Sequence, residues 1–429
     1  MNKVILSLAG LLAAIAFAPE AAAVPSFARQ TGMACNACHQ QHFPVLSKFG
    51  QAFKAGGYTM MGAQGKVEGE HLTLPDTLNA SMLLKARYQK ENGTDPVGTL
   101  SGETTNGGQW QIPDEFSLFF GGRIAENVGF LFEGNTNAPA VLAGFKMPFV
   151  FDAGGAKLSV IPYLTDALGA SYGFEQASTG AVRGVRWAEH RGDISAQQYI
   201  GTDGAATGVA FVALNDMGYI NVSRWSPNFT AAAGTAAIQL KSNYLRIAAT
   251  PTVADWDMHI GVQSWSGSNY VDYVDAAGVL AAGATGVGAS GFFGLVDTKA
   301  TAVDFQAHGH AGGKDLGVYA TWAKAPVVAA VVGGTQGNLF NAGAKELKAF
   351  TIGADYSVVP STLHIGAAYR NAKNGAATND GDNSITLTAV YDLAMNVAFH
   401  MNHSKRSGSA YNAAGSATSL TTLMLEAAW

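Results

Sequence analysis

The sequence predicts an all-β protein: a transmembrane antiparallel β-barrel of about 16 strands, with a small N-terminal helical segment plugging its lumen. Apolar residues alternate with polar ones through much of the second half of the chain, which is the period of a strand with one apolar face. The 429 residues include 52 glycines, and only 13% are charged. After residue 23, no apolar run reaches the length of a membrane-spanning helix. Short and long connections alternate between the expected strands, as in transmembrane barrels.

Residues 1–23 have the features of a cleaved signal peptide for export. Lys3 supplies a positive charge, a largely apolar run extends from Val4 to Ala18, and three alanines at 21–23 offer a small-residue cleavage site. The apolar run is shorter than the roughly 20 residues that a transmembrane helix needs. We therefore expect an exported mature chain that begins near Val24.

Residues 24–76 contain the two cysteines of the chain, Cys35 and Cys38, with His39 directly after them. Two thiols at this spacing serve a redox dithiol, part of a structural zinc site, or the attachment of a haem. A redox dithiol needs a strand-to-helix turn, and the flanking residues predict no buried strand. A zinc site needs further ligands, and no second cysteine pair supplies them. The C-x-x-C-H order is the signature of covalent haem attachment, so this segment is predicted to carry one haem c.

In this interpretation, Cys35 and Cys38 form thioethers with the haem vinyl groups and His39 is the proximal iron ligand. Export agrees with it, because c-type haems are attached outside the cytoplasmic membrane. A segment of this size needs help to fold, and a haem and a barrel lumen would both shelter it. The expected organisation is a signal peptide at 1–23, a monohaem cytochrome c segment at 24–76 and an outer-membrane porin-like barrel at 77–429.

The sixth ligand of the iron is left open by the sequence. Met60, Met61 and His71 are distant enough in sequence to fold back over the haem, and a thioether would raise the redox potential relative to a second imidazole. The two methionines are also expected simply to pack against the haem. His42 lies one helical turn after His39, on the same side of the haem, and is expected to contact a propionate or the surface.

Other residues of the segment are expected to surround the haem. Arg29 and Lys54 are candidates to neutralise its propionates, or they are ordinary solvated charges. Four aromatic residues are expected to pack on it rather than relay electrons: Phe27, Phe43, Phe49 and Phe53.

The strand pattern is clearest in four runs, 350–358, 363–370, 385–391 and 395–402, each of which has one apolar face. His364 and His400 fall on the opposite, polar faces and are expected to line the lumen. The apolar face of the first run consists of Phe350, Ile352, Ala354, Tyr356 and Val358.

Earlier segments repeat this pattern less cleanly, for example in a hairpin expected to turn near residues 125–127. Residues 165–207 and 275–300 are expected mainly as long loops. The chain ends on Trp429, and an aromatic residue closing the last strand resembles the assembly signal of bacterial outer-membrane barrels. Alternation alone also fits a large soluble β-sandwich or solenoid. The export signal, the terminal tryptophan and the uneven loops favour a barrel in lipid.

Residues 25–62 resemble the N-terminal cytochrome segment of the fused monohaem c-type cytochrome–porins of the outer membrane, the family of iron-oxidising outer-membrane cytochromes. The resemblance covers the sequence of this stretch, whereas the barrel is similar only in pattern and size. The motif consists of Pro25-Ser26-Phe27-Ala28-Arg29, Thr31-Gly32, Cys35 to His39, Phe43-Pro44, Phe49-Gly50, Phe53-Lys54 and Gly57-Tyr58.

The resemblance implies an electron conduit in the cell outer membrane, in contact with its lipid. Electrons would pass from extracellular Fe(II), or from another extracellular donor, through the single haem to a periplasmic c-type cytochrome or similar acceptor. Because the hydrocarbon core is about 30 Å thick and insulating, a haem that serves both sides has to sit within the barrel. The chemistry would be Fe(II) oxidation by electron transfer, with no bond-making step.

Two other functions remain open from the sequence. One is a porin-like channel that its haem segment gates or tethers, and the other is a haem sensor or adhesin. The net charge of −5 gives no reason to expect a nucleic-acid partner.

Overall fold

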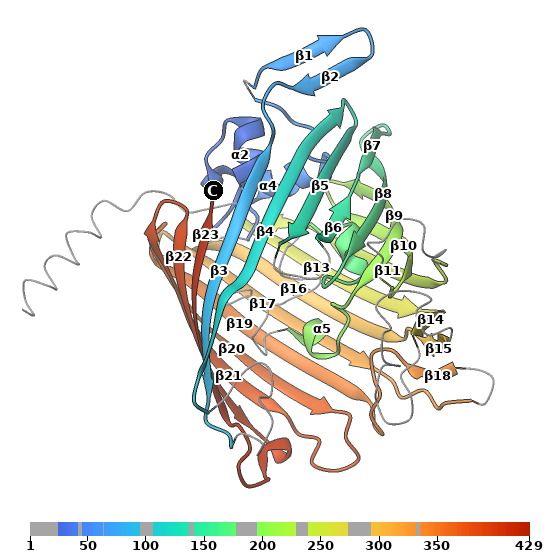
Figure 1. Ribbon diagram of the computed structural model, residues 1–429, viewed down its shortest axis with the longest axis vertical. Coiled ribbons are helices and arrows are strands. Elements are labelled where there is room, and N and C mark those ends of the chain that lie inside the picture. The colour runs from blue at the N-terminus through green and yellow to red at the C-terminus, as the bar shows by residue number, and fades with distance from the viewer. Residues whose placement is uncertain are drawn as a thin grey trace, which may run out of the picture.

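The computed structural model describes residues 25–41, 45–62, 64–94, 106–136, 141–176, 195–228, 239–272, 293–331 and 335–429. Within them, a closed antiparallel β-barrel forms most of the molecule (Figure 1). Eighteen named segments make the ring, but β6 and β7 both lie between β5 and β8, and β12 continues β11 along β13. The ring therefore has 16 strands, which confirms the predicted fold class and strand number.

The barrel strands follow one another around the ring in chain order, and the first strand, β3, pairs with the last, β23. Their bounds are β3 Ala80–Glu91, β4 Gln109–Ala125, β5 Val128–Asn135, β6 Leu142–Lys146, β7 Phe149–Asp152, β8 Lys157–Thr165, β9 Ala206–Asn215, β10 Gly218–Ser226, β11 Ser242–Ala249, β12 Thr252–Val253, β13 Trp256–Ser266, β16 Ala300–Ala311, β17 Lys314–Ala325, β19 Leu347–Val359, β20 Leu363–Asn374, β21 Asn383–Ala394, β22 Val397–Ser407 and β23 Ser419–Ala428.

The two faces of the barrel wall differ in polarity, and the polar face is the buried one. In β19, Ile352 is 44% exposed on the outer face, whereas Thr351 and Asp355 are 4% and 1% exposed on the lumenal face. His364 and His400 are also buried on the lumenal side, as their strand positions predicted. An apolar exterior around a polar interior is the arrangement of a transmembrane barrel and the reverse of a soluble sandwich.

The two ends of the barrel have different connections. At one end, β16 and β17 are joined by Gly312 and Gly313 alone, and β4 ends at Ala125 while β5 begins at Val128, which confirms the hairpin predicted at 125–127. At the other end, residues 166–205 separate β8 from β9. We call these the short-turn end and the long-loop end.

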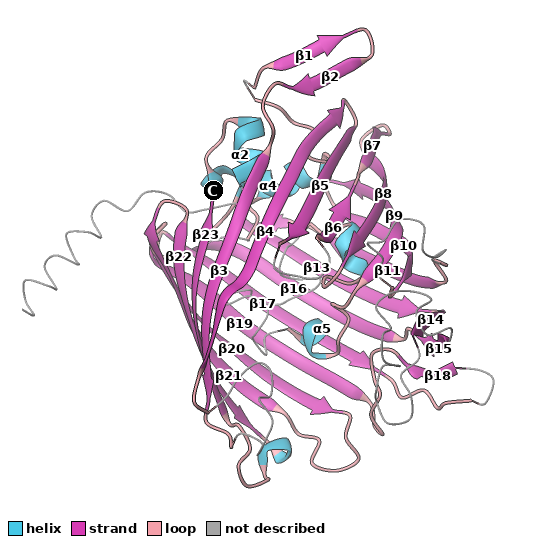
Figure 2. Cartoon of the chain, in the orientation of Figure 1, coloured by secondary structure: helices cyan, strands magenta, loops and turns pink. Residues whose placement is uncertain are grey.

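A compact group of helices lies at the short-turn end, on the same side as the C-terminus (Figures 1 and 2). It consists of α2 Pro25–Thr31, α3 Cys35–Cys38 and α4 Lys48–Ala55. A hairpin of β1 Lys66–Gly69 and β2 Leu72–Pro75 follows it and projects beyond the barrel. No helix among the described residues is long and apolar enough to cross a membrane.

The connection between β8 and β9 enters the lumen, where it carries η1 Ala170–Gly173 and α5 Ala196–Tyr199 (Figure 2). The amide of Ala196 donates to Thr321 Oγ1 at 2.9 Å, and Tyr199 OH donates to Asp382 at 2.8 Å on the far wall. Residues 165–207 were expected mainly as a loop, and their described part contains no strand between β8 and β9.

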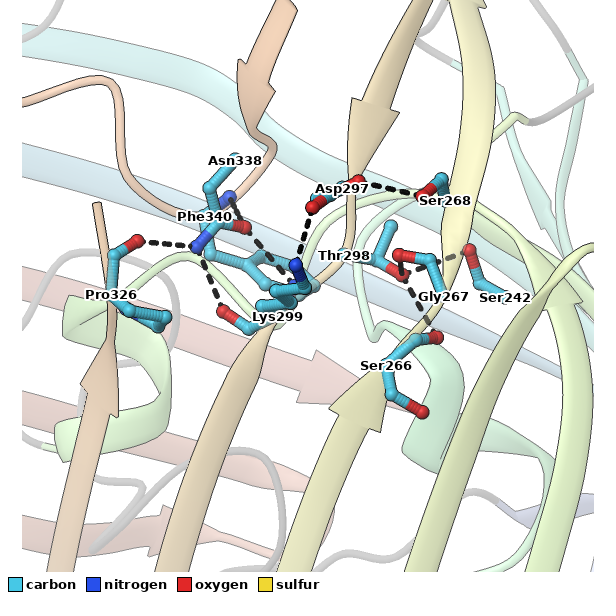
Figure 3. A network of polar contacts seen from close by, with 10 residues as sticks. All are labelled: Ser242, Ser266, Gly267, Ser268, Asp297, Thr298, Lys299, Pro326, Asn338 and Phe340. Atoms are coloured by element: carbon cyan, nitrogen blue, oxygen red, sulfur yellow. Dashed lines mark hydrogen bonds and ion pairs between the residues drawn. The ribbon is translucent and has the colours of Figure 1, made fainter. Parts of the chain in front are cut away.

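A small sheet at the long-loop end consists of β14 Ser268–Asp272, β15 Phe293–Asp297 and β18 Thr335–Asn338. Residues 275–300 were expected mainly as a loop. Their described part begins at 293 and contains β15, whose strand state depends on pairing with two segments elsewhere in the chain, whereas residues 275–292 lie outside the described residues. The Asn338 amide ties this sheet to the barrel by donating to the Pro326 and Lys299 carbonyls at 2.7 and 2.9 Å (Figure 3). A short η2, Ser409–Tyr411, follows β22.

Candidate functional site

The N-terminal helical segment is held inside the lumen by hydrogen bonds to well-separated parts of the wall. Ser26 Oγ lies 2.6 Å from Ser81 Oγ on β3. Gln51 Oε1 lies 3.0 Å from His259 Nε2 on β13. Gln41 Nε2 donates to the Asp355 carbonyl on β19 at 2.8 Å. Because these three strands are spread around the ring, the segment spans the lumen at the short-turn end, and we refer to residues 25–62 as the plug.

Between the plug and the barrel wall is a cavity of about 230 Å³. Both cysteines and His39 line it, together with apolar side chains from the helices and from strands β4 and β5. We call it the motif cavity. Its lining is Phe27, Ala28, Thr31, Met33, Ala34, Cys35, Cys38, His39, Leu46, Gly50, Phe53, Lys54, Tyr58, Phe119, Leu131 and Lys146.

The C-x-x-C-H motif forms one short helical turn. Cys35 and Cys38 begin and end α3, and the His39 amide, at its C-cap, donates to the Cys35 carbonyl at 2.9 Å. The His39 ring nitrogen Nδ1 lies 3.3 Å from the Val45 carbonyl, which accepts its proton. That bond favours the tautomer with its lone pair on Nε2, the arrangement usual for a histidine that ligates a metal.

The Cys38 thiol does not have the electrostatics of a reactive redox thiol. Burial, and secondarily the charge of Cys35, raise the pKa of Cys38 above its usual value. Reactive thiols of oxidoreductases have lowered pKa values instead. In the described part of the chain, no group of three or more His, Cys, Asp and Glu residues is arranged to hold a metal ion. Two thiols on one helical turn, an oriented imidazole and an apolar wall fit a covalently attached haem.

Two lysines line the same cavity. Lys146 Nζ donates to the Tyr172 carbonyl at 3.1 Å and lies 4.1 Å from the centre of the Tyr172 ring. Burial lowers the pKa of Lys54, and the nearby carboxylate of Glu175 partly offsets that effect. Burial raises the pKa of Glu175 in turn. A cationic group beside an apolar cavity would suit an anionic propionate, so the role of Lys54 stays a prediction and Lys146 is a further candidate that the sequence did not reveal.

The structure places the other predicted residues as follows. Phe27 and Phe53 line the motif cavity, and their rings contact each other at 5.2 Å between centroids. Phe49 lines a second cleft instead. Arg29 donates to the Ala80 carbonyl at 2.6 Å and is not part of the cavity lining. His42 and Phe43 lie outside the described residues.

The three predicted candidates for the sixth ligand do not line the motif cavity. His71 lies on the projecting β1–β2 hairpin with a 91% exposed side chain. Met60 is 37% exposed beyond the end of α4, and Met61 follows it. Their ligand role stays a prediction. The methionine that does line the cavity is Met33, two residues before Cys35. Its position in the sequence, next to the motif, is the one feature that could have identified Met33 as a cavity residue.

A second cleft of about 440 Å³ reaches the other side of the motif from the short-turn end. Cys35 and His39 line it, as do three carboxylates from the short turns and adjoining strand ends: Asp255, Asp257 and Asp315. Lys48 crosses it, with Nζ 3.8 Å from Asp257. The motif is therefore reached from this end through an acidic cleft.

Buried aromatic rings occupy the lumen between the plug and the long loops. Phe174 contacts Tyr219 at 5.1 Å, near the short-turn end of β10. Trp225, at the other end of that strand, stacks with Phe340 at 6.3 Å. Tyr244 and Trp265 lie between them in the same cluster, with centroids 5.0 Å apart. The Phe340 amide donates to Asn338 Oδ1 at 3.4 Å, within the network shown in Figure 3.

Replacing Gly50 by alanine tests the fit between α3 and α4. A helix-interior glycine normally gains up to about 1 kcal/mol of stability on this change. Here the added Cβ would lie 2.2 Å from the Cys38 carbonyl oxygen. We expect Gly50→Ala to destabilise the plug by about 1–3 kcal/mol, measured as a lower thermal unfolding temperature of the helical segment by circular dichroism.

The matched control for this prediction is Gly56→Ala at the C-cap of the same helix. Its added Cβ would approach other atoms no closer than 3.4 Å, so the change should be tolerated. If Gly50→Ala proved as stable as Gly56→Ala, the close packing of α3 on α4 would be contradicted.

Fold and site together define a porin-like β-barrel whose short-turn end is filled by its own N-terminal segment. No protein-family model matches the sequence, and no curated protein matches it.

Several solved structures are similar to the chain. The outer membrane channel DcaP of Acinetobacter baumannii has a TM-score of 0.49 and 11% identity, over 82% of this chain and 97% of that one. Outer-membrane expressed OmpT of Vibrio cholerae has a TM-score of 0.47 and 11% identity, over 85% and 100%. OprB of Pseudomonas putida has a TM-score of 0.49 and 9% identity, over 82% and 93%. The barrel itself is defined by its own strand pairing, and these likenesses add no argument about function.

Proposed function

We propose that the protein is an electron conduit of the outer membrane. It takes electrons from extracellular Fe(II), or from another one-electron donor, and passes them through one c-type haem to a periplasmic cytochrome c or similar carrier. The motif cavity carries this proposal, because Cys35, Cys38 and an oriented His39 meet there against apolar walls inside the barrel. The resemblance of residues 25–62 to the iron-oxidising outer-membrane cytochromes supports Fe(II) as the donor.

A haem bound in this cavity would supply a one-electron couple. The chain's own residues would then have separate tasks: the two cysteines would hold it, His39 would ligate its iron, and Lys54 and Lys146 would balance its propionates. Phe27, Phe53 and the wall residues Phe119 and Leu131 exclude water. A dry site strengthens the electrostatic influence of each of these charges on the couple.

The apolar exterior supports a position in lipid. In single-chain bacterial barrels the short turns face the periplasm and the long loops face outward. The plug would then lie at the periplasmic mouth. The acidic cleft beside Cys35 and His39 would give a periplasmic carrier access to the haem edge. The buried aromatic cluster would lie along the path from the outer loops.

One observation favours the alternative of a porin-like channel gated by its plug: the lumenal wall carries charged pairs such as Arg246–Asp304, and a polar lumen is typical of porins. The two functions differ in what the intact protein lets through. A conduit transfers electrons while the plug excludes solutes, whereas a channel passes ions.

The test uses the purified, haem-loaded, full-length protein. On addition of Fe(II) at the working pH, the oxidised haem spectrum should convert to the reduced one, whereas addition of Zn(II) should leave it unchanged. In planar bilayers, the same preparation should show far less conductance than an open porin. Absence of reduction would refute the conduit, and a large open-pore current without reduction would support the channel.

A further inference from the structure

The motif cavity contains one thioether among its described lining residues, the side chain of Met33, and this points to a ligand that the sequence left open. A haem iron held by His39 accepts one more axial ligand, and a methionine sulfur there gives a higher potential than a second imidazole. A site that accepts electrons from Fe(II) benefits from a high potential. The assignment of this ligand rests on the proposed haem function.

The backbone around Met33 is fixed by the end of helix α2. The Gly32 amide donates to the Ala28 carbonyl at 2.8 Å, and Gly32 has φ of +70°, which glycine adopts without strain. The Met33 amide then donates to Thr31 Oγ1 at 3.3 Å. This turn ends α2 and leads the chain into α3, so that Met33 and His39 flank the two cysteines from opposite ends of that helix.

Most other donor side chains of the cavity are already engaged. Thr31 Oγ1 donates to the Phe27 carbonyl at 2.8 Å. Lys146 Nζ donates to the Tyr172 carbonyl at 3.1 Å. The Tyr58 ring stacks on Phe27 at 4.9 Å. Among the described lining residues, Lys54 and Tyr58 are therefore the ones that compete with Met33 as ligands.

We propose that Met33 Sδ is the sixth ligand of a haem iron attached at Cys35 and Cys38, with His39 as the other axial ligand. The exposed fraction of Met33, 38%, reflects a side chain at the cavity rim that a bound haem would cover. Met60 and Met61, which the sequence offered for this role, lie off the cavity lining and serve as its controls.

The experiment compares absorption and electron paramagnetic resonance spectra of full-length, haem-loaded variants. Met33→Leu should keep covalent haem, shown by the haemochrome of the denatured protein. It should lose the low-spin ferric signal and the methionine–iron charge-transfer band, and its midpoint potential should fall. Met33→His should restore a low-spin signal at a potential below that of the wild type. Met60→Leu and Met61→Leu should retain all wild-type signals.

The outcomes separate this inference from the function on which it rests. An unchanged low-spin spectrum in Met33→Leu, or its loss in Lys54→Gln alone, overturns the assignment while covalent haem and Fe(II) reduction still support the conduit. A wild-type protein without covalent haem overturns both. If Met33→Leu fails to assemble, as judged by gel mobility of the unheated barrel, the Met33→His variant decides: a spectrum identical to the wild type in band position and potential overturns the assignment.

Discussion

Serine in place of both Cys35 and Cys38 should abolish covalent haem attachment and, with it, reduction of the protein by Fe(II). The two thiols end the same helical turn and line the cavity that His39 also lines, so no other residue of the chain can replace the thioethers. The expected effect is complete loss of haem-dependent peroxidase staining after denaturing electrophoresis. Barrel assembly should persist, because all 16 strands of the ring lie outside the plug.

The control for this change is Met60→Leu, which alters the same segment off the cavity lining and should stain fully. Staining of the double serine variant at the wild-type level would contradict attachment at this motif. Staining lost in both variants would indicate a defect of export or folding instead.

Arg246→Met should destabilise the barrel strongly, because it breaks an ion pair in the lumen. The guanidinium contacts Asp304 through two hydrogen bonds of 2.6 and 2.9 Å, and both side chains are fully buried. Removing the guanidinium leaves a buried carboxylate whose remaining hydrogen bond, among the described residues, comes from Gln263 Nε2 at 2.7 Å. We expect a loss of about 3–5 kcal/mol in the free energy of unfolding, measured by urea titration in lipid vesicles.

Two further variants serve as the control and the rescue for this prediction. Arg224→Met, on the exposed face near the long-loop end, should change stability by about 1 kcal/mol or less. Arg246→Met combined with Asp304→Leu should recover much of the loss, because replacing a buried ion pair by apolar side chains is often nearly neutral. Equal losses for Arg246→Met and Arg224→Met would show that the buried pair contributes little.

The barrel could be predicted from the sequence because the alternation of apolar and polar residues is visible within each strand. In the run from Phe350 to Val358, every second residue is apolar, and the structure turns that set outward while Thr351 and Asp355 face the lumen. The same holds for β20, where Ile365 faces out and His364 faces in. Strand β15 escaped prediction because its pairing partners come from elsewhere in the chain, one of them parallel.

The roles of the cysteines and His39 could be proposed from the sequence for the same reason, since five consecutive residues define the motif. The rest of the site was not, because it depends on packing between distant segments. Lys146 reaches the cavity from β6, and Phe119 and Leu131 from β4 and β5. Sequence distance pointed to Met60, Met61 and His71 as residues that fold back, whereas Met33, which that reasoning did not consider, lines the cavity without any such return.

The seam between β3 and β23 sets an order of events during assembly. The ring cannot close until residues 419–428 have been made, and by then the plug, which precedes β3, has long been exported. If the proposed haem is attached, the enzyme that joins it to Cys35 and Cys38 would meet an open chain early and a crowded lumen late. Because the last strand is made long after the plug, the N-terminal segment can be processed before the barrel closes and inserts into the membrane.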